Sequence, residues 1–242
     1  MFPTLLKLGS FELSTYGVLV AAAYLIGISW LNSKRSEMGL SEDDFWELIY
    51  WLFGGALLGG KVGYAIVERD PSRLWRDLRY GFVFYGGMLG ALAAGWIVQR
   101  RRKFSYARVA DYFGVAGPLG HGIGRLGCLA AGCCYGRHTD MPWGVALAGD
   151  PSRHPTQVYE AAACFAIAAV VHRVGLPRVR DGRWRPGAAF LLYMALYAVA
   201  RFGVEALRGD DRGGFWWGLS PSQWGAFVLL AAAAALSLRR RE

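Results

Sequence analysis

Seven apolar segments, each long enough or nearly long enough to cross a bilayer, dominate this 242-residue sequence. A helix needs roughly 17–25 residues to span about 30 Å of hydrocarbon. The chain is 54% hydrophobic and 19% charged, whereas soluble domains average about 45–50% and about 25%. We therefore predict an all-α, polytopic membrane protein with about seven transmembrane helices, folded as a single integral membrane domain over residues 1–242. The segments cover residues 15–31, 45–67, 82–99, 105–132, 157–172, 187–206 and 220–238, of which the fifth is the shortest.

The distribution of basic residues predicts the orientation. The loops after the first, third and fifth segments and the C-terminal tail carry more lysines and arginines than the other connections. Cytoplasmic loops are enriched in these residues. We expect the N-terminus outside, the C-terminus in the cytoplasm, and outer loops near 68–81, 133–156 and 207–219. Because the basic residues follow this pattern, the net charge of +9 is not interpreted as nucleic-acid binding, and no nucleic-acid partner is expected.

Glycines recur four residues apart in the second segment, at Gly55, Gly59 and Gly63, and in the third, at Gly86 and Gly90. Small residues at this spacing let helix backbones approach closely in a bilayer, where burial gives no hydrophobic drive between helices. We interpret these glycines as helix-packing positions.

Several charged residues lie inside the apolar segments, and each costs about 2.5–3.5 kcal/mol at a helix centre. Such side chains normally face a cavity or a charged partner. Arg201 and Glu205 are four residues apart and can pair on one helix face, and Asp111 can cap its helix. Arg125 has no acidic residue three or four positions away, so it needs a partner from elsewhere or an anionic ligand. They include Lys61, Asp111, Arg125, Glu160, Arg201 and Glu205.

Anionic ligands inside membranes are mostly lipid phosphates. Arg125 and Arg201, brought together with Lys61 in a cavity, would bind a phospholipid headgroup. The planar guanidinium suits this task because it bonds two phosphate oxygens at once. The sequence thus predicts an anion site that takes a membrane lipid.

Eight short stretches spread over nearly the whole chain carry a recognisable pattern: Tyr16-Gly17, GGKVGY at 59–64, FYGGMLG at 84–90, GRLG at 124–127, GCCYGR at 132–137, PWGV at 142–145, RHPTQVYEA at 153–161 and YAVARFGVEALRGDD at 197–211. In these stretches the sequence resembles the bacterial prolipoprotein diacylglyceryl transferases. RHPTQVYE and RF-x-VE-x-x-R-x-x-D are the most specific of them. The seven segments and the outward N-terminus also suit that family.

The resemblance implies an enzyme of the bacterial inner membrane with its active site toward the periplasm and no cofactor. Such enzymes move the diacylglyceryl group of phosphatidylglycerol onto the thiol of the lipobox cysteine in a prolipoprotein signal peptide, releasing glycerol phosphate. The thiol should react as thiolate, and the departing phosphate needs cationic stabilisation. The resemblance assigns functional roles to Arg125, Arg201, Tyr197, Tyr16 and Gly136.

Four positions depart from the family's usual residues. Tyr85 stands where the family has a histidine, a candidate base for the thiol, and a tyrosine with a reference pKa of about 10 is a poor base at neutral pH. Cys128 replaces an asparagine, Cys133 replaces a glutamate, and Lys61 stands where arginine is common. His121, four residues before the signature arginine, is a candidate replacement base. The alternative is a packing or capping histidine.

These considerations give two sets of candidate site residues, and neither includes a metal ligand. The candidate catalytic residues are Arg125, Arg201, Tyr197, Tyr16, Tyr85 and His121. The candidate substrate-binding residues are Arg125, Gly136, Lys61, Cys128, Glu160 and Glu205. Two other functions stay open: a divergent paralogue that uses another lipid or acceptor with cysteine chemistry, and a non-catalytic lipid-binding membrane protein.

Three of the four cysteines, Cys128, Cys133 and Cys134, are close together in the sequence. A bridge from Cys128 to either of the others would be a structural staple in an oxidising periplasm. Free thiols, a metal site shared with nearby histidines, and thiol redox chemistry are the alternatives. The spacing is not that of a standard zinc site. We expect Cys164, in the fifth segment, to be a small core residue.

The orientation can be tested with a reporter that is active only in the cytoplasm. Fused after residue 103 or after residue 242, the reporter should be active, because the positive-inside rule places both positions in the cytoplasm. Fused at residue 140, it should be silent. Activity at residue 140 would contradict the predicted orientation.

Overall fold

A computed structural model describes residues 2–9, 11–77, 81–146, 151–209 and 217–238. These residues are mostly helical and belong to two compact units. The first unit combines Met1–Leu31 with Ala110–Glu242, and the second is Asn32–Val109. Parts of the expected outer loops, at 78–80, 147–150 and 210–216, lie outside the described residues, as do residues 239–242 of the basic tail.

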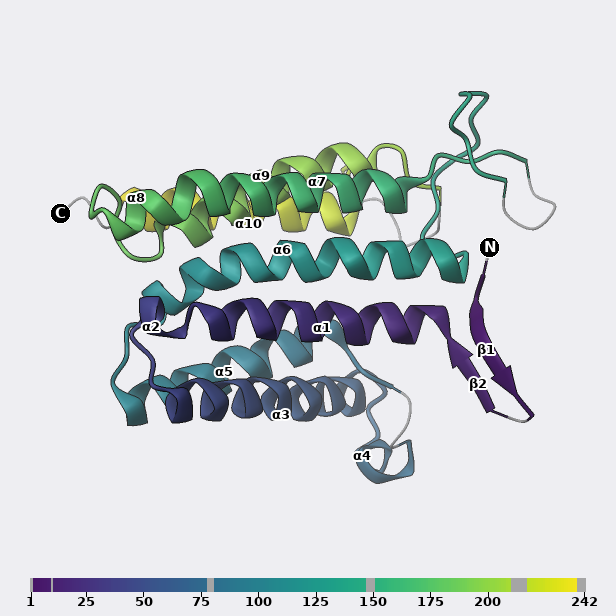
Figure 1. The fold of residues 1–242 in the computed structure, drawn as a ribbon. Coiled ribbons are helices and arrows are strands. Elements are labelled where there is room, and N and C mark those ends of the chain that lie inside the picture. Colours follow the sequence, from purple (N-terminus) through teal and green to yellow (C-terminus); the bar gives the residue numbers. More distant parts are fainter. Residues whose placement is uncertain (1, 10, 78–80, 147–150, 210–216, 239–242) are drawn as a thin grey trace. The chain divides into compact units, whose positions relative to one another are not determined.

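Each predicted apolar segment contains a long helix (Figure 1). Four of the described helical stretches are long and apolar enough to cross a membrane: Thr15–Ser33, Glu42–Val67, Thr156–Arg180 and Ala188–Glu205. The mostly helical, membrane-compatible fold is thus confirmed, while the count of seven spans and the orientation stay predictions. The helices are α1 (Thr15–Ser33), α2 (Arg35–Met38), α3 (Glu42–Val67), α4 (Arg73–Arg76), α5 (Phe84–Arg102), α6 (Tyr106–Ala131), α7 (Thr156–Val170), α8 (Leu176–Arg180), α9 (Ala188–Glu205) and α10 (Pro221–Leu238).

The fifth segment forms a longer helix than its apolar run predicted. α7 continues through a π-helical turn, η1 (Val171–Gly175), into α8, so the helical stretch covers 25 residues. Pro177 lies in the first turn of α8. A proline inside a regular helix removes a hydrogen bond and clashes with the preceding turn, and the wider π turn just before it is a place where a helix can absorb such a defect.

A short hairpin before α1 supplies the two β-strands found within the described residues, and isolated β-bridges occur in the later loops. Strands β1 (Thr4–Leu8) and β2 (Phe11–Ser14) pair antiparallel. Lys7 lies opposite Glu12 in this register, and the two side chains form an exposed ion pair. Gly9 supports the reversal with a φ of +59°, which residues with a side chain rarely adopt. The sequence analysis predicted no strand here.

The second unit is built on close contact between α3 and α5, which lie side by side (Figure 1). A Cβ added at Gly55 would lie 2.6 Å from both the Ala94 Cβ and the Gly90 carbonyl oxygen. A Cβ at Gly63 would lie 3.1 Å from the Gly86 Cα. These glycines therefore let two backbones meet, as their four-residue spacing predicted.

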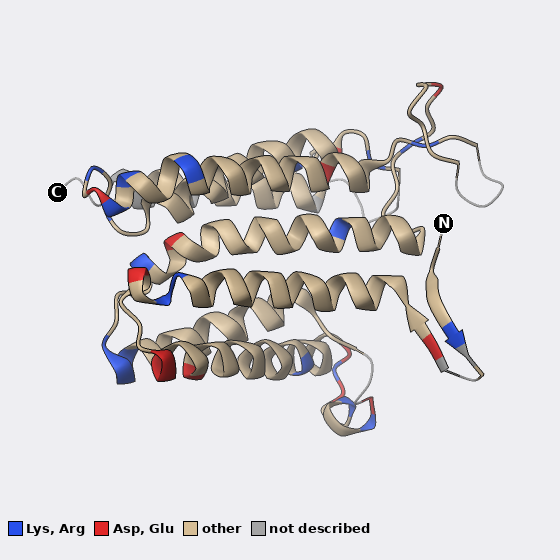
Figure 2. Ribbon diagram, viewed as in Figure 1, with Lys and Arg blue, Asp and Glu red and all other residues tan. Residues whose placement is uncertain are grey.

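Within the first unit, α7 and α10 both pack against α9, and Asp111 ties α6 to the start of α9. The Asp111 carboxylate accepts the Gly187 N–H at 2.7 Å and the Phe190 N–H at 3.0 Å. The first N–H groups of a helix have no partner within it, and a negative charge there is favourable. Asp111 thus caps a different helix, not its own. Most charged residues lie near helix ends or in loops, with few in the middle of the helices (Figure 2).

Neighbouring glycines in α3 offer a matched test of the packing. Gly55→Ala should lower the free energy of unfolding by about 1–3 kcal/mol, since the new methyl group has no space against α5. Gly54→Ala should be neutral or slightly stabilising, because a Cβ there meets nothing within 4 Å and alanine favours helix. Thermal unfolding of both purified variants measures the difference. Equal stability would contradict the packing model.

Candidate functional site

The carboxylate of Glu160 is the centre of a charged cluster in the first unit. Glu160 lies near the start of α7 and is only 2% exposed. Its Oε1 accepts hydrogen bonds from Arg125 Nη2 at 3.0 Å and from the Tyr197 hydroxyl at 3.1 Å. Its Oε2 accepts one from Arg201 Nη1 at 3.3 Å and lies 3.9 Å from Arg208 Nη1. One buried carboxylate thus holds side chains from α6, α9 and the segment after α9.

Helical spacing explains why α9 contributes several side chains to the cluster. Tyr197, Arg201 and Glu205 are four residues apart, so they share one helix face. Arg201 Nη2 lies 2.6 Å from Glu205 Oε2 and donates to Ser222 Oγ at 3.0 Å. The Ser220 hydroxyl donates to Glu205 Oε1 at 2.8 Å. Both glutamates therefore hold Arg201, and the predicted pairing of Arg201 with Glu205 is present.

The cluster gathers several arginine side chains in a place shielded from solvent. The side chains of Arg125, Arg201 and Arg208 are 14%, 9% and 3% exposed, and those of Glu160 and Glu205 are 2% and 7% exposed. Among the described residues, three guanidinium groups face two carboxylates, and Arg208 also contacts the Cys134 thiol. Buried charges need partners, and guanidinium groups gathered in this way can also contact an anionic ligand.

His121 lies one turn before Arg125 on α6 and belongs to the same cluster. Its Nε2 accepts a hydrogen bond from Arg125 Nε at 3.2 Å and lies 3.4 Å from Glu160 Oε1. Its ring centroid is 5.3 Å from that of Tyr197. The bond from Arg125 occupies the Nε2 lone pair, so the imidazole orients the arginine in this arrangement.

Gly136 places Arg208 through a close meeting of three loop segments. Gly136 forms an isolated β-bridge with Arg208, and its N–H donates to the His154 carbonyl at 2.9 Å. A Cβ at Gly136 would lie 2.7 Å from both the His154 and the Leu207 carbonyl oxygens. Only glycine fits this crossing. The contacts give Gly136 a structural role, and its predicted role in substrate binding stays a prediction.

The other predicted site residues divide between the two units. Tyr16, in the first turn of α1, packs at Gly127, where an added Cβ would lie 3.1 Å from its ring. This places Tyr16 between the positions of Arg125 and Cys128 on α6. Lys61 and Tyr85 belong to the second unit. There Lys61 donates to the Asp77 carbonyl and lies over the Phe82 ring at 4.6 Å, so a role for it in the arginine cluster stays a prediction.

Arg208 and Ser222 are site residues that the sequence analysis did not select. Arg208 is the second arginine of the RF-x-VE-x-x-R-x-x-D stretch, so the motif held a signal for it. Ser222 follows the first residue of α10 and carries no comparable signal. Arg125 has the partner from elsewhere in the chain that the sequence called for, because it bonds to Glu160, 35 residues away. This partner helps to explain how Arg125 can lie inside an apolar helix.

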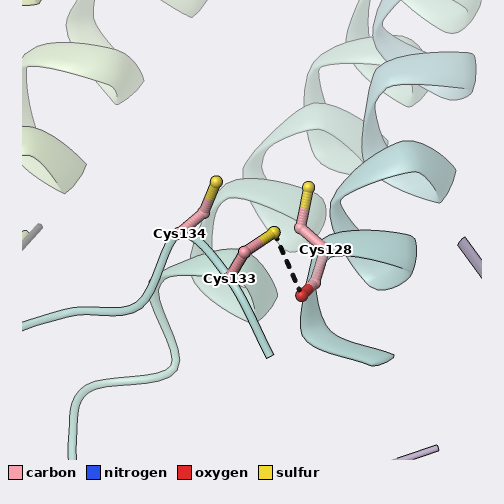
Figure 3. A group of neighbouring side chains, drawn as sticks. All are labelled: Cys128, Cys133 and Cys134. Atoms are coloured by element: carbon pink, nitrogen blue, oxygen red, sulfur yellow. Dashed lines mark hydrogen bonds between the residues drawn. The ribbon is translucent and has the colours of Figure 1, made fainter. Parts of the chain in front are cut away.

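The cysteines are free thiols in the structure. Cys128, Cys133 and Cys134 bring their sulfur atoms within 4.8 Å of one another (Figure 3). The pKa of the Cys134 thiol lies well below its usual range, because the Cys128 thiol and the Arg208 guanidinium hydrogen-bond to its thiolate. The structure therefore favours thiols over the predicted staple. Cys164 is fully buried, as expected of a core residue.

Comparison with known proteins matches this chain along nearly its whole length. A family model described as prolipoprotein diacylglyceryl transferase matches residues 3–239. The chain is 31% identical over 223 residues to a phosphatidylglycerol–prolipoprotein diacylglyceryl transferase of Clostridium tetani, covering 88% of each chain. It is 34% identical over 224 residues to one of the same name from Geobacter sulfurreducens, covering 86% of this chain and 83% of the relative.

Replacing the central carboxylate tests whether the cluster stabilises the fold. Glu160→Gln should lower the free energy of unfolding by about 3–5 kcal/mol, because it leaves buried arginines with only one carboxylate. Asp181→Asn is the control, since its ion pair with Arg183 is exposed and should contribute less than about 1 kcal/mol. Thermal unfolding measures both. A Glu160→Gln variant as stable as the control would contradict the proposed counter-ion role.

Proposed function

The chain belongs to the prolipoprotein diacylglyceryl transferase family, and on this premise we propose that it transfers the diacylglyceryl group of phosphatidylglycerol to the lipobox cysteine of prolipoproteins. The donor is a membrane lipid, and the acceptor is a thiol in a signal peptide. The products are a thioether-linked lipid on the acceptor and glycerol phosphate.

The gathering of three buried arginine side chains around Glu160 is the observation that carries this proposal. Arg125, Arg201 and Arg208 present guanidinium groups from three segments toward one small region. Guanidinium groups bind phosphate oxygens in a bidentate manner. Glu160 and Glu205 hold two of these groups in place before the lipid arrives, so binding requires little reorganisation.

The chemistry explains why such a site is needed. The acceptor thiolate attacks an alkyl carbon, and the bond from that carbon to the phosphate oxygen breaks. Negative charge then grows on the departing glycerol phosphate. Preorganised cations in a place shielded from water stabilise such charge more strongly than they do in solution. The arginines would therefore bind the donor and also accelerate the step in which the phosphate leaves.

The same proposal places the chain in the bacterial inner membrane as a multi-pass protein with about seven spans. The N-terminus would lie outside, the C-terminus in the cytoplasm, and the cluster toward the periplasmic side. The four long apolar helices and the charge pattern of the loops support this placement. Prolipoprotein signal peptides would enter from the membrane.

Activation of the acceptor thiol is the step for which the chain lacks the family's expected group. Tyr85 occupies the position of the usual histidine and is a poor base at neutral pH. His121 uses its Nε2 lone pair to accept the Arg125 hydrogen bond. Tyr85 and His121 stay candidate residues for this step, and a further group that favours the thiolate would assist them.

Restoring lipoprotein lipidation in cells depleted of their own transferase is the direct test of the function. Expression of this chain should return the lipid-modified form of a prolipoprotein, detected as a mass increase on its cysteine. Expression at normal levels in the membrane with no modified product would contradict the proposal. A chain with Arg125→Ala is the inactive comparison.

Arg125 and Arg201 carry the quantitative prediction. Loss of one charge-assisted contact to phosphate should cost about 2–4 kcal/mol in the transition state, or roughly a 30- to 1000-fold loss of rate. Lysine at either position should restore little, because it keeps the charge but loses the bidentate geometry. Initial rates with phosphatidylglycerol and a lipobox peptide measure the effect.

The Arg201 variant needs its own control, because Arg201→Ala leaves Glu205 without its guanidinium partner. The double variant Arg201→Ala with Glu205→Gln removes that stranded charge. If the double variant folds and transfers lipid at the wild-type rate, Arg201 is a structural partner only. If Arg125→Ala is also close to wild type, the phosphate-site proposal is wrong.

A further inference from the structure

The end of α6 brings Cys128 and Cys133 side by side. The Cys133 N–H donates to the Cys128 carbonyl at 3.1 Å, and the Gly132 N–H donates to the Leu129 carbonyl at 3.1 Å. With Gly132 at φ +72°, these bonds form a Schellman motif, which places the residue after the glycine against the last turn of the helix. The Cys133 thiol accordingly lies 3.7 Å from the Cys128 carbonyl oxygen (Figure 3).

Cys134 is the third cysteine of the group, and its backbone conformation is costly for a residue with a side chain. Its φ is +65°, and such a backbone persists only where its surroundings hold it. Side chains at the start of α7 stabilise this backbone conformation. The Thr156 hydroxyl donates to the Cys134 carbonyl at 2.9 Å, and the Gln157 side chain donates to the Cys133 carbonyl at 2.6 Å. The three sulfur atoms are thus gathered by fixed backbone segments.

The sulfur cluster adjoins the arginine cluster. Cys128 lies three residues after Arg125 on α6, and Arg208 contacts both Cys134 and the region of Glu160. Three thiolates and a divalent ion together carry one negative charge, which the nearby guanidinium groups can balance. A site here would therefore stand next to the proposed position of the lipid phosphate.

We propose that Cys128, Cys133 and Cys134 bind a zinc ion through three thiolates and leave its fourth position open. Thiolates select soft or borderline ions such as Zn²⁺. Zinc–sulfur bonds of about 2.3 Å in tetrahedral geometry put the sulfurs about 3.8 Å apart, so sulfurs that lie within 4.8 Å of one another need to close by only about 1 Å. Zinc sites with three protein ligands and an open position are typically catalytic.

The fourth position fits the thiol of the acceptor, and this part rests on the proposed function. A thiol that coordinates zinc is deprotonated, so its proton passes to solvent as it binds. The acceptor sulfur then forms a bond to the glyceryl carbon, and the carbon–oxygen bond breaks. Glycerol phosphate leaves with the bonding electrons, and the uncharged thioether is a weak ligand that dissociates. The metal thereby supplies activation in a chain where Tyr85 stands in place of the family's expected histidine.

Metal analysis of the purified full chain tests the site. Wild-type protein, purified without chelators, should hold about one zinc ion per chain, and Ala variants of Cys128, Cys133 or Cys134 should lose it. Cys164→Ala is the matched control, since this thiol is buried within α7 outside the cluster, and it should keep the metal. Wild-type protein without zinc that also fails to bind added zinc would overturn the proposal, whatever the variants do.

Cobalt substitution then tests the fourth position independently of activity. Co²⁺ in the wild-type protein should give thiolate-to-metal charge-transfer bands, and a lipobox peptide should change them as a fourth thiolate binds. The same peptide with serine in place of cysteine should not. No response to the thiol peptide would overturn the acceptor role.

The outcomes separate this proposal from the proposed function. Lipid transfer at the full rate by a metal-free wild-type protein would refute the role of zinc in activating the acceptor and leave the transferase intact. The opposite outcome has two parts: the cobalt-substituted protein responds to the peptide, but the zinc-loaded protein transfers no lipid. This result would support the metal site and refute the transferase. A disulfide between any two of the three cysteines in active protein, detected by mass spectrometry, would also overturn the zinc site.

Discussion

The bonds that converge on the Glu160 carboxylate hold the functional region together. A buried ion pair is no strong source of stability by itself, yet breaking one is costly because the remaining charge is stranded. Here a single carboxylate contacts Arg125, Arg201 and Tyr197 from two other helices. Its position therefore fixes where the guanidinium groups can point, and the site exists only as long as α6, α7 and α9 keep their mutual arrangement.

Features that depend on residues close together in the chain could be predicted from the sequence. Long apolar runs predicted the helices, because a bilayer imposes both length and composition. The four-residue spacing of Arg201 and Glu205 predicted their contact. The pairing of Arg125 with Glu160 joins residues far apart in the chain, so spacing alone could not reveal it. The resemblance to a known family, confirmed by the family match, named most of the residues without explaining how they meet.

The conformations of the loops that complete the site could not be predicted from the sequence. Gly136 admits the crossing that places Arg208, and a left-handed Cys134 turns its thiol toward Cys128. Neither effect follows from composition or periodicity, because both depend on backbone segments that meet only after folding. Cys128 and Cys133, which the resemblance leads one to expect as departures from the family's usual residues, lie in this same region.

The cap that Asp111 provides for α9 limits insertions and deletions in α6. α6 is attached at one end through Asp111 and about four turns later through Arg125. One residue inserted between them would rotate Arg125 by about 100° about the helix axis, away from Glu160, while the cap stayed in place. The number of residues in α6 between these two attachments is therefore fixed by the two contacts that the helix must make at once.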